Sequence, residues 1–483
     1  MAPDGSKEKI TIVDLFAGLG GFHLGLSQVD GWDVECVFAS ELDPDLGRLY
    51  LKNFDHPEAR FSNDVTDTRR VSKSTLEKMG AINAEILCAG FPCQPFSKAG
   101  QQKGLECERN GNLFELGVKR LIQIVNPRLL LLENVPNLER HDEGRTWKTI
   151  QEELGQIGYE VTHKILSPTQ FGVPQVRRRM FIVGWKKGDP FGDYFDWPDV
   201  LRLDQIKKLT VRSIVDSSIR QRNTLPEHYN EALNLWSEFL DAIGPHAELP
   251  SPLWGMEFGA TYDFETIGSQ PRNCQLRNKK YRKVRGAFGS LLWSSGKEPE
   301  SRRDFLRNIP GYAHGRSAFP EWKKKFIRQS REVYTRVRKD LPSQWVKRIK
   351  KLPPSLQKFE WNCGDSVRDI SKHLVQFRAS GVRIKRANAT PALVTMASQI
   401  PVLGKERRFL TVEECARLQG VQSLEFGDLK EVQIHKALGN AVCVEVITSV
   451  GRQIARARKS KLPRPGSQAE IKHLLAPKRI GSR

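Results

Sequence analysis

Cysteine is scarce in this chain: eight of its 483 residues are cysteine, and none of them forms a Cys-x-x-Cys pair or a Cys/His cluster. The sequence therefore predicts neither a structural zinc site nor a disulfide framework. Long apolar runs are missing as well. The run Leu129–Leu132 is too short to span a bilayer, and the polar start MAPDGSKEKI is followed by no apolar targeting core. These absences favour a cytosolic protein with no metal site and no membrane partner.

Negative charge is in deficit. The 77 lysines and arginines outnumber the 56 aspartates and glutamates, which gives a formal net charge of +21. Such an excess favours an anionic partner, and a nucleic acid is the simplest one. A basic surface also serves solubility alone, so charge by itself supports the two interpretations about equally.

Short apolar runs alternate with amphipathic stretches from residue 10 to about 185. Several runs are apolar throughout, as parallel strands buried on both faces should be. The alternation predicts an α/β fold with a doubly wound, mostly parallel Rossmann-like sheet. The predicted strands are KITIVDLF, DVECVFAS, AEILCAG, PRLLLLENV, YEVTHKIL and RRRMFIVGW.

The composition of the sequence changes after about residue 185, and the alternating pattern of apolar runs and amphipathic stretches returns after about residue 400. Residues 186–400 are rich in tryptophan, proline and basic residues, and include a mostly helical basic segment from Trp322 to Lys351. That segment is either a solvated helix face or a phosphate-facing surface. We expect a first domain at 8–185, a second, irregular one at 186–400, a return to the first at 401–458, and a loosely ordered basic tail at 459–483. The return should hold a helix beginning after Thr411 and a second one over about 441–457.

Polar groups follow three predicted strands in succession. A glycine-rich turn, Phe16 to Gly21, follows the first strand and lets the backbone approach a cofactor closely. Glu41 ends the second strand, where a carboxylate accepts hydrogen bonds from ribose hydroxyls. Asp64 stands where a third such loop is expected and suits an adenine amino group. Singly, each acid is equally well a helix cap; three in register favour a nucleoside site.

Chemistry-bearing residues follow the next strands. Cys93 lies in GFPCQPFS, directly after the strand Glu85 to Ala89, where a thiol can enter a cleft. A lone cysteine is more often buried and inert, which fits Cys36 and Cys88. Glu133 ends a fully apolar strand, an expensive place for a carboxylate without a function or a partner. Such burial raises the pKa of a carboxyl group and lets it hold a proton.

Taken together, these motifs resemble those of the DNA (cytosine-5)-methyltransferase family. The resemblance rests on DLFAGLGGFHLGL, ILCAGFPCQPFSKAGQQKG, ENV after an apolar strand, QVRRR before a strand, RFLTVEECARLQG and LGNAV, in that order along the chain. It covers roughly residues 10–185 and 400–457. In this family the intervening stretch is a variable target recognition domain.

The resemblance implies covalent catalysis on a cytosine that has been flipped out of the DNA stack. The thiolate of Cys93 would add to C6 while Glu133 holds or protonates N3. C5 would then take a methyl group from S-adenosyl-L-methionine. Arg177 and Arg179 would support the base O2, the nearby phosphate or the nucleophile, since a positive neighbour favours the thiolate.

The resemblance also assigns binding residues. The expected cofactor contacts are Phe16, Gly18, Gly20, Gly21, Glu41, Leu42, Asp64, Pro92, Leu113, Asn440 and Val442. The loop from about Phe96 to Asn110 is expected to be a lid that closes on DNA. The expected DNA contacts are Gln94, Ser97, Lys98, Gln101, Arg109, Arg383 and Lys385. For Arg383 and Lys385 a basic strand edge is an equally good interpretation.

Three departures from the family pattern stand out. Leu42 occupies a position where some relatives have an aromatic residue, so stacking on adenine is weaker. The loop GluArgAsnGlyAsnLeu, residues 108–113, is longer than in many relatives, which leaves the roles of Arg109 and Asn110 open. Ala441 stands where serine is common.

Double-stranded DNA is the expected partner. The enzyme is expected to act as a monomer in the bacterial cytosol, associated with the nucleoid, as part of a restriction-modification system or alone. A cognate endonuclease would act on the same site. The nearest alternative is a transfer-RNA cytosine-5-methyltransferase of the same fold. A catalytically silent DNA-binding protein would not need Cys93, Glu133 and Arg177 together, and a nicotinamide dehydrogenase would explain only the glycine turn.

Overall fold

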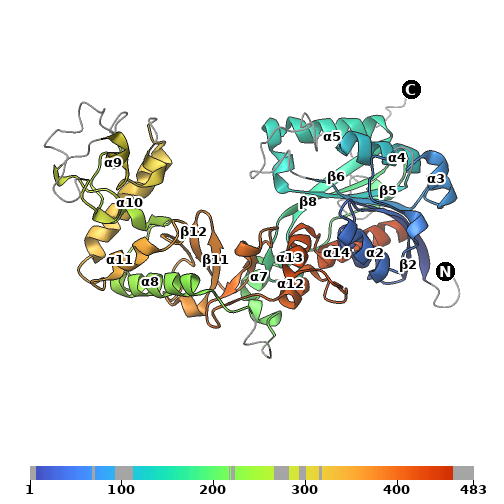
Figure 1. Cartoon of the computed structure of the whole chain (residues 1–483). Coiled ribbons are helices and arrows are strands. Elements are labelled where there is room, and N and C mark those ends of the chain that lie inside the picture. The colour runs from blue at the N-terminus through green and yellow to red at the C-terminus, as the bar shows by residue number, and fades with distance from the viewer. Residues whose placement is uncertain are drawn as a thin grey trace, which may run out of the picture. The chain divides into compact units, whose positions relative to one another are not determined.

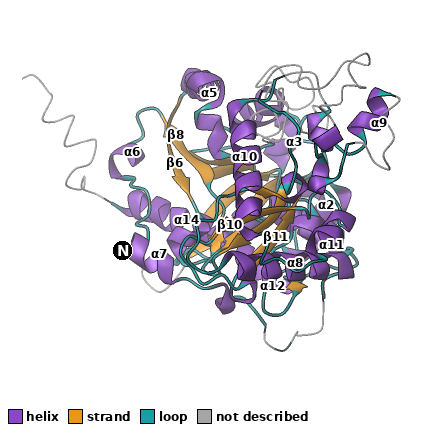
Figure 2. Cartoon of the chain, turned by 90° about the vertical axis from the view of Figure 1, so that its left-hand side faces the viewer, coloured by secondary structure: helices purple, strands orange, loops and turns teal. Residues whose placement is uncertain are grey.

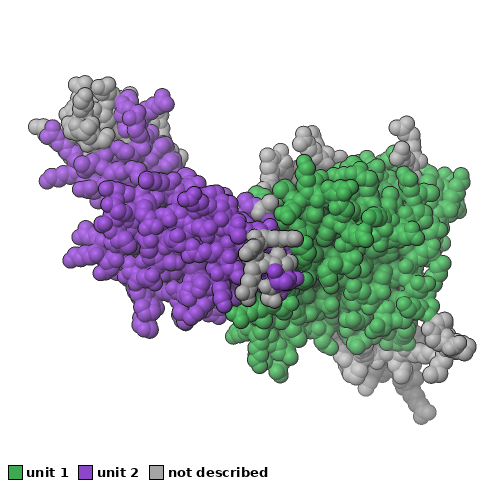
Figure 3. Space-filling model, turned by 60° about the horizontal axis from the view of Figure 1, so that its bottom comes forward, with its two compact units in different colours: residues 1–214, 391–397, 412–483 green, residues 215–390, 398–411 purple. Residues whose placement is uncertain are grey.

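The computed structural model describes residues 7–67, 71–92, 113–216, 218, 223–265, 282–292, 301–314 and 318–460. The chain forms two compact units (Figure 3). Unit 1 comprises residues 1–214, 391–397 and 412–483, and unit 2 comprises residues 215–390 and 398–411. Unit 2 thus begins 29 residues after residue 186, where the sequence composition predicted the start of the second domain. Most of the predicted tail at 459–483 lies outside the described residues.

Unit 1 is built on a seven-stranded sheet with the order β3-β2-β1-β4-β5-β8-β6. The strands from β3 to β5 are parallel, whereas β8 runs antiparallel to both of its neighbours. The mostly parallel α/β sheet expected from the sequence is therefore confirmed. The strands are β1 (Glu8–Leu15), β2 (Trp32–Ser40), β3 (Phe61–Ser62), β4 (Ile86–Gly90), β5 (Leu129–Asn134), β6 (Tyr159–Leu166) and β8 (Arg179–Lys186).

Both faces of this sheet are buried. In β5, Leu129 and Leu131 pack into the core on one face, and Leu130 and Leu132 pack into the core on the other. Helices cover both faces, with α4 and α5 above the sheet and α2 and α14 below it in Figure 1. The helices before unit 2 are α1 (Gly21–Ser27), α2 (Pro44–Asn53), α3 (Lys73–Lys78), α4 (Arg120–Val125), α5 (Arg145–Gln156), α6 (Phe191–Tyr194) and α7 (Leu203–Lys208).

The end of the chain completes the layer that begins with α1. The returning segment forms α12 (Val412–Gln419), α13 (Glu431–Asn440) and α14 (Val444–Lys459). The helix predicted over about 441–457 is α14, which begins three residues later because Ala441 and Cys443 have extended backbones that separate it from α13. The helices α1 and α14 touch so closely that a Cβ on Gly25 would lie 2.6 Å from Cβ of Ile447.

Unit 2 holds a six-stranded sheet with the order β15-β14-β11-β12-β10-β9. Helices pack on one face of it; Figure 2 draws the helices in purple and the strands in orange. The strands are β9 (Leu253–Trp254), β10 (Lys358–Asn362), β11 (Leu374–Arg378), β12 (Gly381–Lys385), β14 (Val402–Leu403) and β15 (Arg408–Phe409). The helices are α8 (Glu227–Ile243), α9 (Arg302–Leu306), α10 (Glu321–Val337) and α11 (Trp345–Lys351), and β13 (Thr390–Pro391) follows where the chain leaves the unit.

Aromatic rings and paired charges stabilise unit 2. Trp345 is fully buried against Trp236, whose ring stacks on Phe359 at a centroid distance of 4.7 Å. Several cations of the basic segment are already paired within the unit: Arg331 with the buried Glu257, and Arg348 with two glutamates of α8. For these residues the intramolecular ion pair explains the positive charge without any phosphate.

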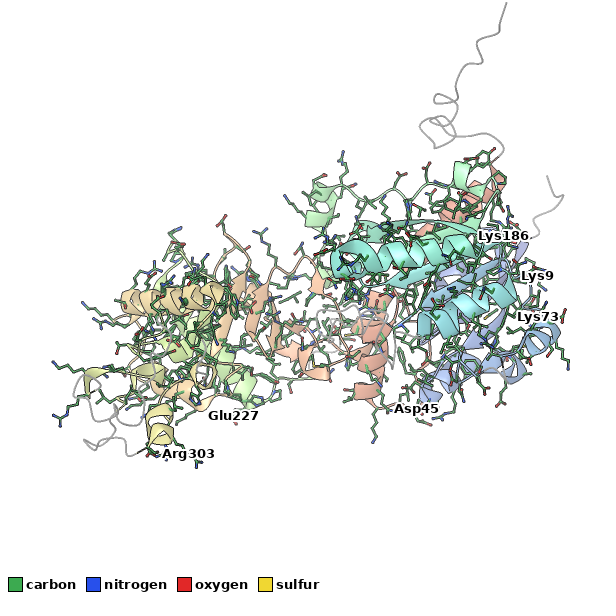
Figure 4. The ribbon with its side chains drawn as sticks, turned by 90° about the horizontal axis from the view of Figure 1, so that it is seen from above. Lys9, Asp45, Lys73, Lys186, Glu227 and Arg303 are labelled. Atoms are coloured by element: carbon green, nitrogen blue, oxygen red, sulfur yellow. The ribbon has the colours of Figure 1, made fainter. Side chains whose placement is uncertain are left out.

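Other charged residues stand on the outside of the molecule. Glu227 begins α8 and Arg303 belongs to α9, and both lie at the periphery of unit 2 in Figure 4. Lys9, Lys73 and Lys186 lie at the periphery of unit 1 in the same view. Among the described helices, none combines the length and the apolar character needed to cross a membrane.

The contact between α1 and α14 yields a first prediction. Gly25→Ala should lower the free energy of unfolding by about 1–3 kcal/mol, because the added methyl group meets Ile447 in a packed core. Alanine inside a helix would otherwise stabilise by about 1 kcal/mol. The control is Gly311→Ala, where a Cβ meets no atom within 4 Å. Urea unfolding monitored by fluorescence measures both variants, and equal stabilities would contradict the packing argument.

Candidate active site

The carboxyl ends of β1, β2, β4 and β5 bring the predicted residues to one edge of the sheet. Strand order reverses between β1 and β4, which lie side by side although β2 and β3 separate them in sequence. Ligands of open α/β sheets bind outside the carboxyl ends at such a switch point. Gly90, the last residue of β4, is paired in register with Glu133 of β5. The turn after β1, the Glu41 segment and Glu133 therefore share this edge.

The turn after β1 has left-handed backbone angles and passes close to neighbouring side chains. Phe16, Gly18 and Gly20 all have positive φ angles, of 57°, 55° and 75°. A Cβ on Gly20 would lie 2.2 Å from the ring of Phe54, and one on Gly21 would lie 2.6 Å from Cγ2 of Val442. The glycines thus provide the left-handed turn and let the start of α1 pack against the returning chain.

Glu41 ties the turn to the end of β2. Its Oε2 accepts a hydrogen bond from the Gly18 N–H at 2.8 Å, and its Oε1 accepts one from the Asp43 N–H at 2.9 Å. Burial outweighs these bonds and raises the pKa of Glu41. A carboxylate has about four acceptor sites, so two bonds leave room for ribose hydroxyls.

The next two predicted cofactor residues differ in their surroundings. Leu42 is 73% exposed, which is unusual for a leucine and leaves an apolar surface beside Glu41. Asp64 is also exposed, and its Oδ1 accepts hydrogen bonds from the backbone N–H and the hydroxyl of Thr66, at 2.8 and 2.7 Å. Leu42 could cover the flat face of a base, and Asp64 could accept from an amino group.

A buried acid beneath this edge was not singled out from the sequence. Asp14, the second-to-last residue of β1, is fully buried, and desolvation raises its pKa well above the usual range for aspartate. It lies among Tyr50, Cys36 and Cys88. The available signal was an acid inside the apolar run ITIVDLF, which is the same pattern that pointed to Glu133.

Glu133 stands at the end of β5 with one cation at its side. Its Oε1 lies 2.9 Å from Nε of Arg179, the first residue of β8. Burial raises the pKa of Glu133, and the positive charges of Arg179 and Arg177 only partly oppose this effect. A carboxyl group in this state holds a proton at higher pH than an exposed glutamate does. It can therefore donate a hydrogen bond or a proton to a basic ring nitrogen.

Arg177 has a different environment from Arg179. It follows β7 (Gln175–Val176), and its side chain is buried. Its two terminal nitrogens donate to the carbonyl oxygens of Leu393 and Gly439, each at 2.8 Å. These bonds join the start of β8 to the segment after β13 and to the end of α13. A contact of Arg177 with a base or a phosphate stays a prediction.

The other predicted site residues fall into several groups. Asn440 ends α13 and is exposed, whereas Val442 is buried against Gly21. Pro92 and Leu113 are half-buried at the two borders of a stretch without description. Arg383 and Lys385 lie on β12 of unit 2. The predicted residues that lie outside the described ranges are Cys93, Gln94, Ser97, Lys98, Gln101 and Arg109.

The described cysteines are unsuited to act as nucleophiles. All five are buried free thiols, as the sequence predicted for Cys36 and Cys88. Burial raises the pKa of Cys36 and of Cys363 to about 12, and that of Cys443 to about 11. A nucleophilic cysteine needs the opposite shift, toward the thiolate.

Sequence reasoning also missed a buried glutamine that supports this edge. Gln175 is fully buried, its Nε2 donates to the Leu418 carbonyl at 2.8 Å, and its Oε1 accepts from the Leu393 N–H at 3.2 Å. It thus shares the Leu393 segment with Arg177. A glutamine beside three arginines reads as part of a polar loop, so the sequence carried no signal for its burial.

The bonds of Arg177 predict a structural effect. Arg177→Lys should lower the free energy of unfolding by about 2 kcal/mol or more, because an ammonium group cannot donate to both carbonyls in the same geometry. The matched control is Arg178→Lys at the exposed neighbouring position, which should change stability by less than about 0.5 kcal/mol. Chemical unfolding measures both, and equal losses would contradict this role of Arg177.

The raised pKa of Glu133 predicts a pH-dependent effect. The folded state holds the proton of Glu133 more tightly, so the wild type loses stability as pH rises above the ordinary glutamate pKa of about 4.3. Glutamine cannot ionise, so the difference in unfolding free energy, Glu133→Gln minus wild type, should rise between pH 4 and pH 8. Its slope should not exceed about 1.4 kcal/mol per pH unit. The control is Glu77→Gln on the surface of α3; a flat curve for both variants would refute the prediction.

Known proteins resemble this chain over most of its length. The family model described as C-5 cytosine-specific DNA methylase matches residues 10–243 and 278–456. Type II methyltransferase M.AluI of Cellulosimicrobium cellulans is 29% identical over 526 aligned residues, covering 98% of this chain and 97% of that protein.

Two further relatives match over nearly the whole chain and over half of it, respectively. Type II methyltransferase M.HgiCI of Herpetosiphon aurantiacus is 28% identical over 455 residues, covering 91% of this chain and 96% of that protein. Type II methyltransferase M.HpaII of Haemophilus parainfluenzae is 38% identical over 248 residues, covering 50% of this chain and 60% of that protein. With most of its length matched, this chain belongs to the C-5 cytosine-specific DNA methylase family and is a DNA (cytosine-5)-methyltransferase.

Proposed function

We propose that this enzyme methylates one cytosine within a short sequence of duplex DNA, with Cys93 as nucleophile and Glu133 as the proton-holding group. One observation carries the proposal: the buried carboxyl of Glu133 is in register with Gly90, three residues before Cys93 in the chain. A Cβ on Gly90 would lie 3.8 Å from Oε2 of Glu133. The loop that bears the thiol therefore leaves the sheet beside a group that can protonate a base.

The chemistry divides between these two residues. The Cys93 thiolate forms a bond to C6 of a flipped cytosine, and Glu133 gives a hydrogen bond or a proton to N3. The electron pair of the C5–C6 double bond then becomes available at C5, which turns nucleophilic. After C5 has gained its methyl group, the C5 proton is lost to solvent, the proton on N3 returns to Glu133, and the Cys93 sulfur departs as the thiolate, which restores the ring. Arg179, whose Nε lies 2.9 Å from Oε1 of Glu133, keeps that carboxyl group oriented.

The residues at the sheet edge fit S-adenosyl-L-methionine, which supplies the electrophilic methyl group when bound. The left-handed turn from Phe16 to Gly20 allows close approach of the backbone. Glu41 retains acceptor sites for the ribose hydroxyls, Leu42 covers the adenine face, and Asp64 accepts from the adenine amino group. The predicted contacts of Pro92, Leu113, Asn440 and Val442 complete this binding site.

The remaining roles follow from the same proposal. Unit 2 is the target recognition domain, and residues 391–397 and 412–458 return to the catalytic domain. The enzyme acts as a monomer on double-stranded DNA in the bacterial cytosol, close to the nucleoid. A restriction endonuclease that cuts the same sequence is its expected counterpart, because the relatives named above are type II methyltransferases.

Expression in a host without cytosine methylation, followed by bisulfite sequencing, tests the proposal. We expect methylcytosine at one short recurrent sequence, and none above background with Cys93→Ser, because a serine hydroxyl is a far weaker nucleophile than a thiolate. The control Cys363→Ser changes a buried thiol of unit 2 whose pKa is raised to about 12, and it should keep methylation. Undiminished methylation by Cys93→Ser would refute the role of Cys93. Unmethylated DNA from folded wild-type enzyme would refute the proposed substrate.

A further inference from the structure

The central strands of unit 2 carry polar side chains on the face opposite the core. Glu360 of β10 is in register with Arg383 of β12, which is in register with Gln376 of β11. Alternate residues of a strand point to the same face. The residues between them, such as Phe359 and Val382, are buried in the core of the unit. The polar side, called the charged face below, is formed by Lys358, Glu360, Gln376, Arg378, Arg383 and Lys385.

One carboxylate organises this face. Glu360 is only 8% exposed. Its Oε1 lies 2.5 Å from Nη2 of Arg378, and its Oε2 accepts from Nε of Arg383 at 2.7 Å. The two arginines stand on neighbouring strands, β11 and β12, and a single acid holds both. An ion pair this far from water fixes the orientation of the guanidinium planes before any ligand arrives.

The charged face keeps an excess of positive charge. Its four cationic side chains oppose the single negative charge of Glu360. Burial and, to a smaller extent, the neighbouring charge of Arg383 lower the pKa of Lys385. Nε of Arg378 is buried and has no hydrogen-bond partner among the described residues. Such a face suits a ligand that presents hydrogen-bond acceptors to a fixed set of donors.

Two kinds of acceptor on DNA could meet these arginines, and the position of Glu360 discriminates between them. Phosphate contacts depend on net charge, so a carboxylate in their midst weakens them. Base edges are recognised by the geometry of donors, and the fork of an arginine matches O6 and N7 of guanine. Glu360 lowers the net positive charge of the face, which disfavours phosphate contacts, and it fixes the orientation of the arginine donors, which favours recognition of base edges.

We infer that Glu360 is a positioning residue that holds Arg378 and Arg383 to read a guanine edge of the DNA on which this enzyme acts. The inference rests on the proposed function and adds to it which residues of unit 2 distinguish one sequence from another. Lys358 and Lys385, at the border of the same face, contact the adjoining phosphates.

The test is the variant Glu360→Gln, which keeps the shape of the side chain and removes its charge. Its kcat/KM is measured on the duplex that carries the methylated sequence and on duplexes with single base-pair changes. The matched control is Glu238→Gln in the same unit, which removes a carboxylate paired with Arg348 on α8 and α11. Thermal unfolding of each variant accompanies the kinetics.

We expect Glu360→Gln to bind unrelated duplexes more tightly and to prefer the correct sequence less strongly. Removing the negative charge should strengthen binding to unrelated duplexes by about two- to fivefold at low salt. The preference for the correct sequence should fall by about tenfold, because the arginine forks are no longer fixed. Glu238→Gln should leave the preference unchanged. An unchanged preference in Glu360→Gln, with tighter binding to every duplex, would show phosphate contacts and overturn the inference; a lowered unfolding temperature with unchanged preference would show a structural role only.

A second variant keeps the inference testable if Glu360→Gln does not fold. Arg383→Lys retains the positive charge at a partly exposed position but loses the planar fork. It should lower the preference by about tenfold with little effect on binding to unrelated DNA, and an unchanged preference would overturn the inference. Failure of the proposed function is recognised separately, because the wild type would then produce no methylcytosine at any sequence.

Discussion

Apolar side chains cover both faces of the sheet in unit 1, and this double burial decides where ionisable groups can stand. A charged side chain in the middle of a strand would need a partner inside the core, so ionisable side chains that take part in the reaction lie at the strand ends. Glu41, Glu133 and Arg179 all occupy such ends. Glu133 gains its proton-holding character from the apolar run Leu129–Leu132 that precedes it, because the same burial that stabilises β5 raises the pKa of the carboxyl group at its end. Stability of the sheet and reactivity of its edge therefore have one physical origin.

Much of unit 1 could be predicted because its signals are local. Runs such as LLLLEN favour a strand buried on both faces, and the glycine turn permits left-handed backbone angles. The reversed direction of β8 left no mark on the sequence, since an apolar strand reads alike in both directions. The role of Arg177 was also hidden, because its carbonyl partners come from segments more than 200 residues away.

Unit 2 was less predictable because some of its cationic side chains form ion pairs within the unit and others do not. The chain carries a large positive excess, and the sequence could not separate paired cations from unpaired ones. Arg331 and Arg348 prove to be held by glutamates inside the unit. Glu360 lies between Phe359 and Trp361 and looks like the polar half of an alternating strand. Its importance depends on Arg378 and Arg383, which only the register of three strands brings together.

The close contact between α1 and α14 has a consequence for biosynthesis. More than 400 residues separate Gly25 from Ile447, the two residues that meet there. At a synthesis rate of 5–20 residues per second, roughly 20–80 s pass between their appearance at the ribosome. During that time the groove around Gly25 and the adjoining face of β1 lack their cover, while unit 2 is translated and can fold. The nascent chain therefore exposes an apolar face of the sheet until α14 is made, and the docking of α14 on this face follows the synthesis of unit 2.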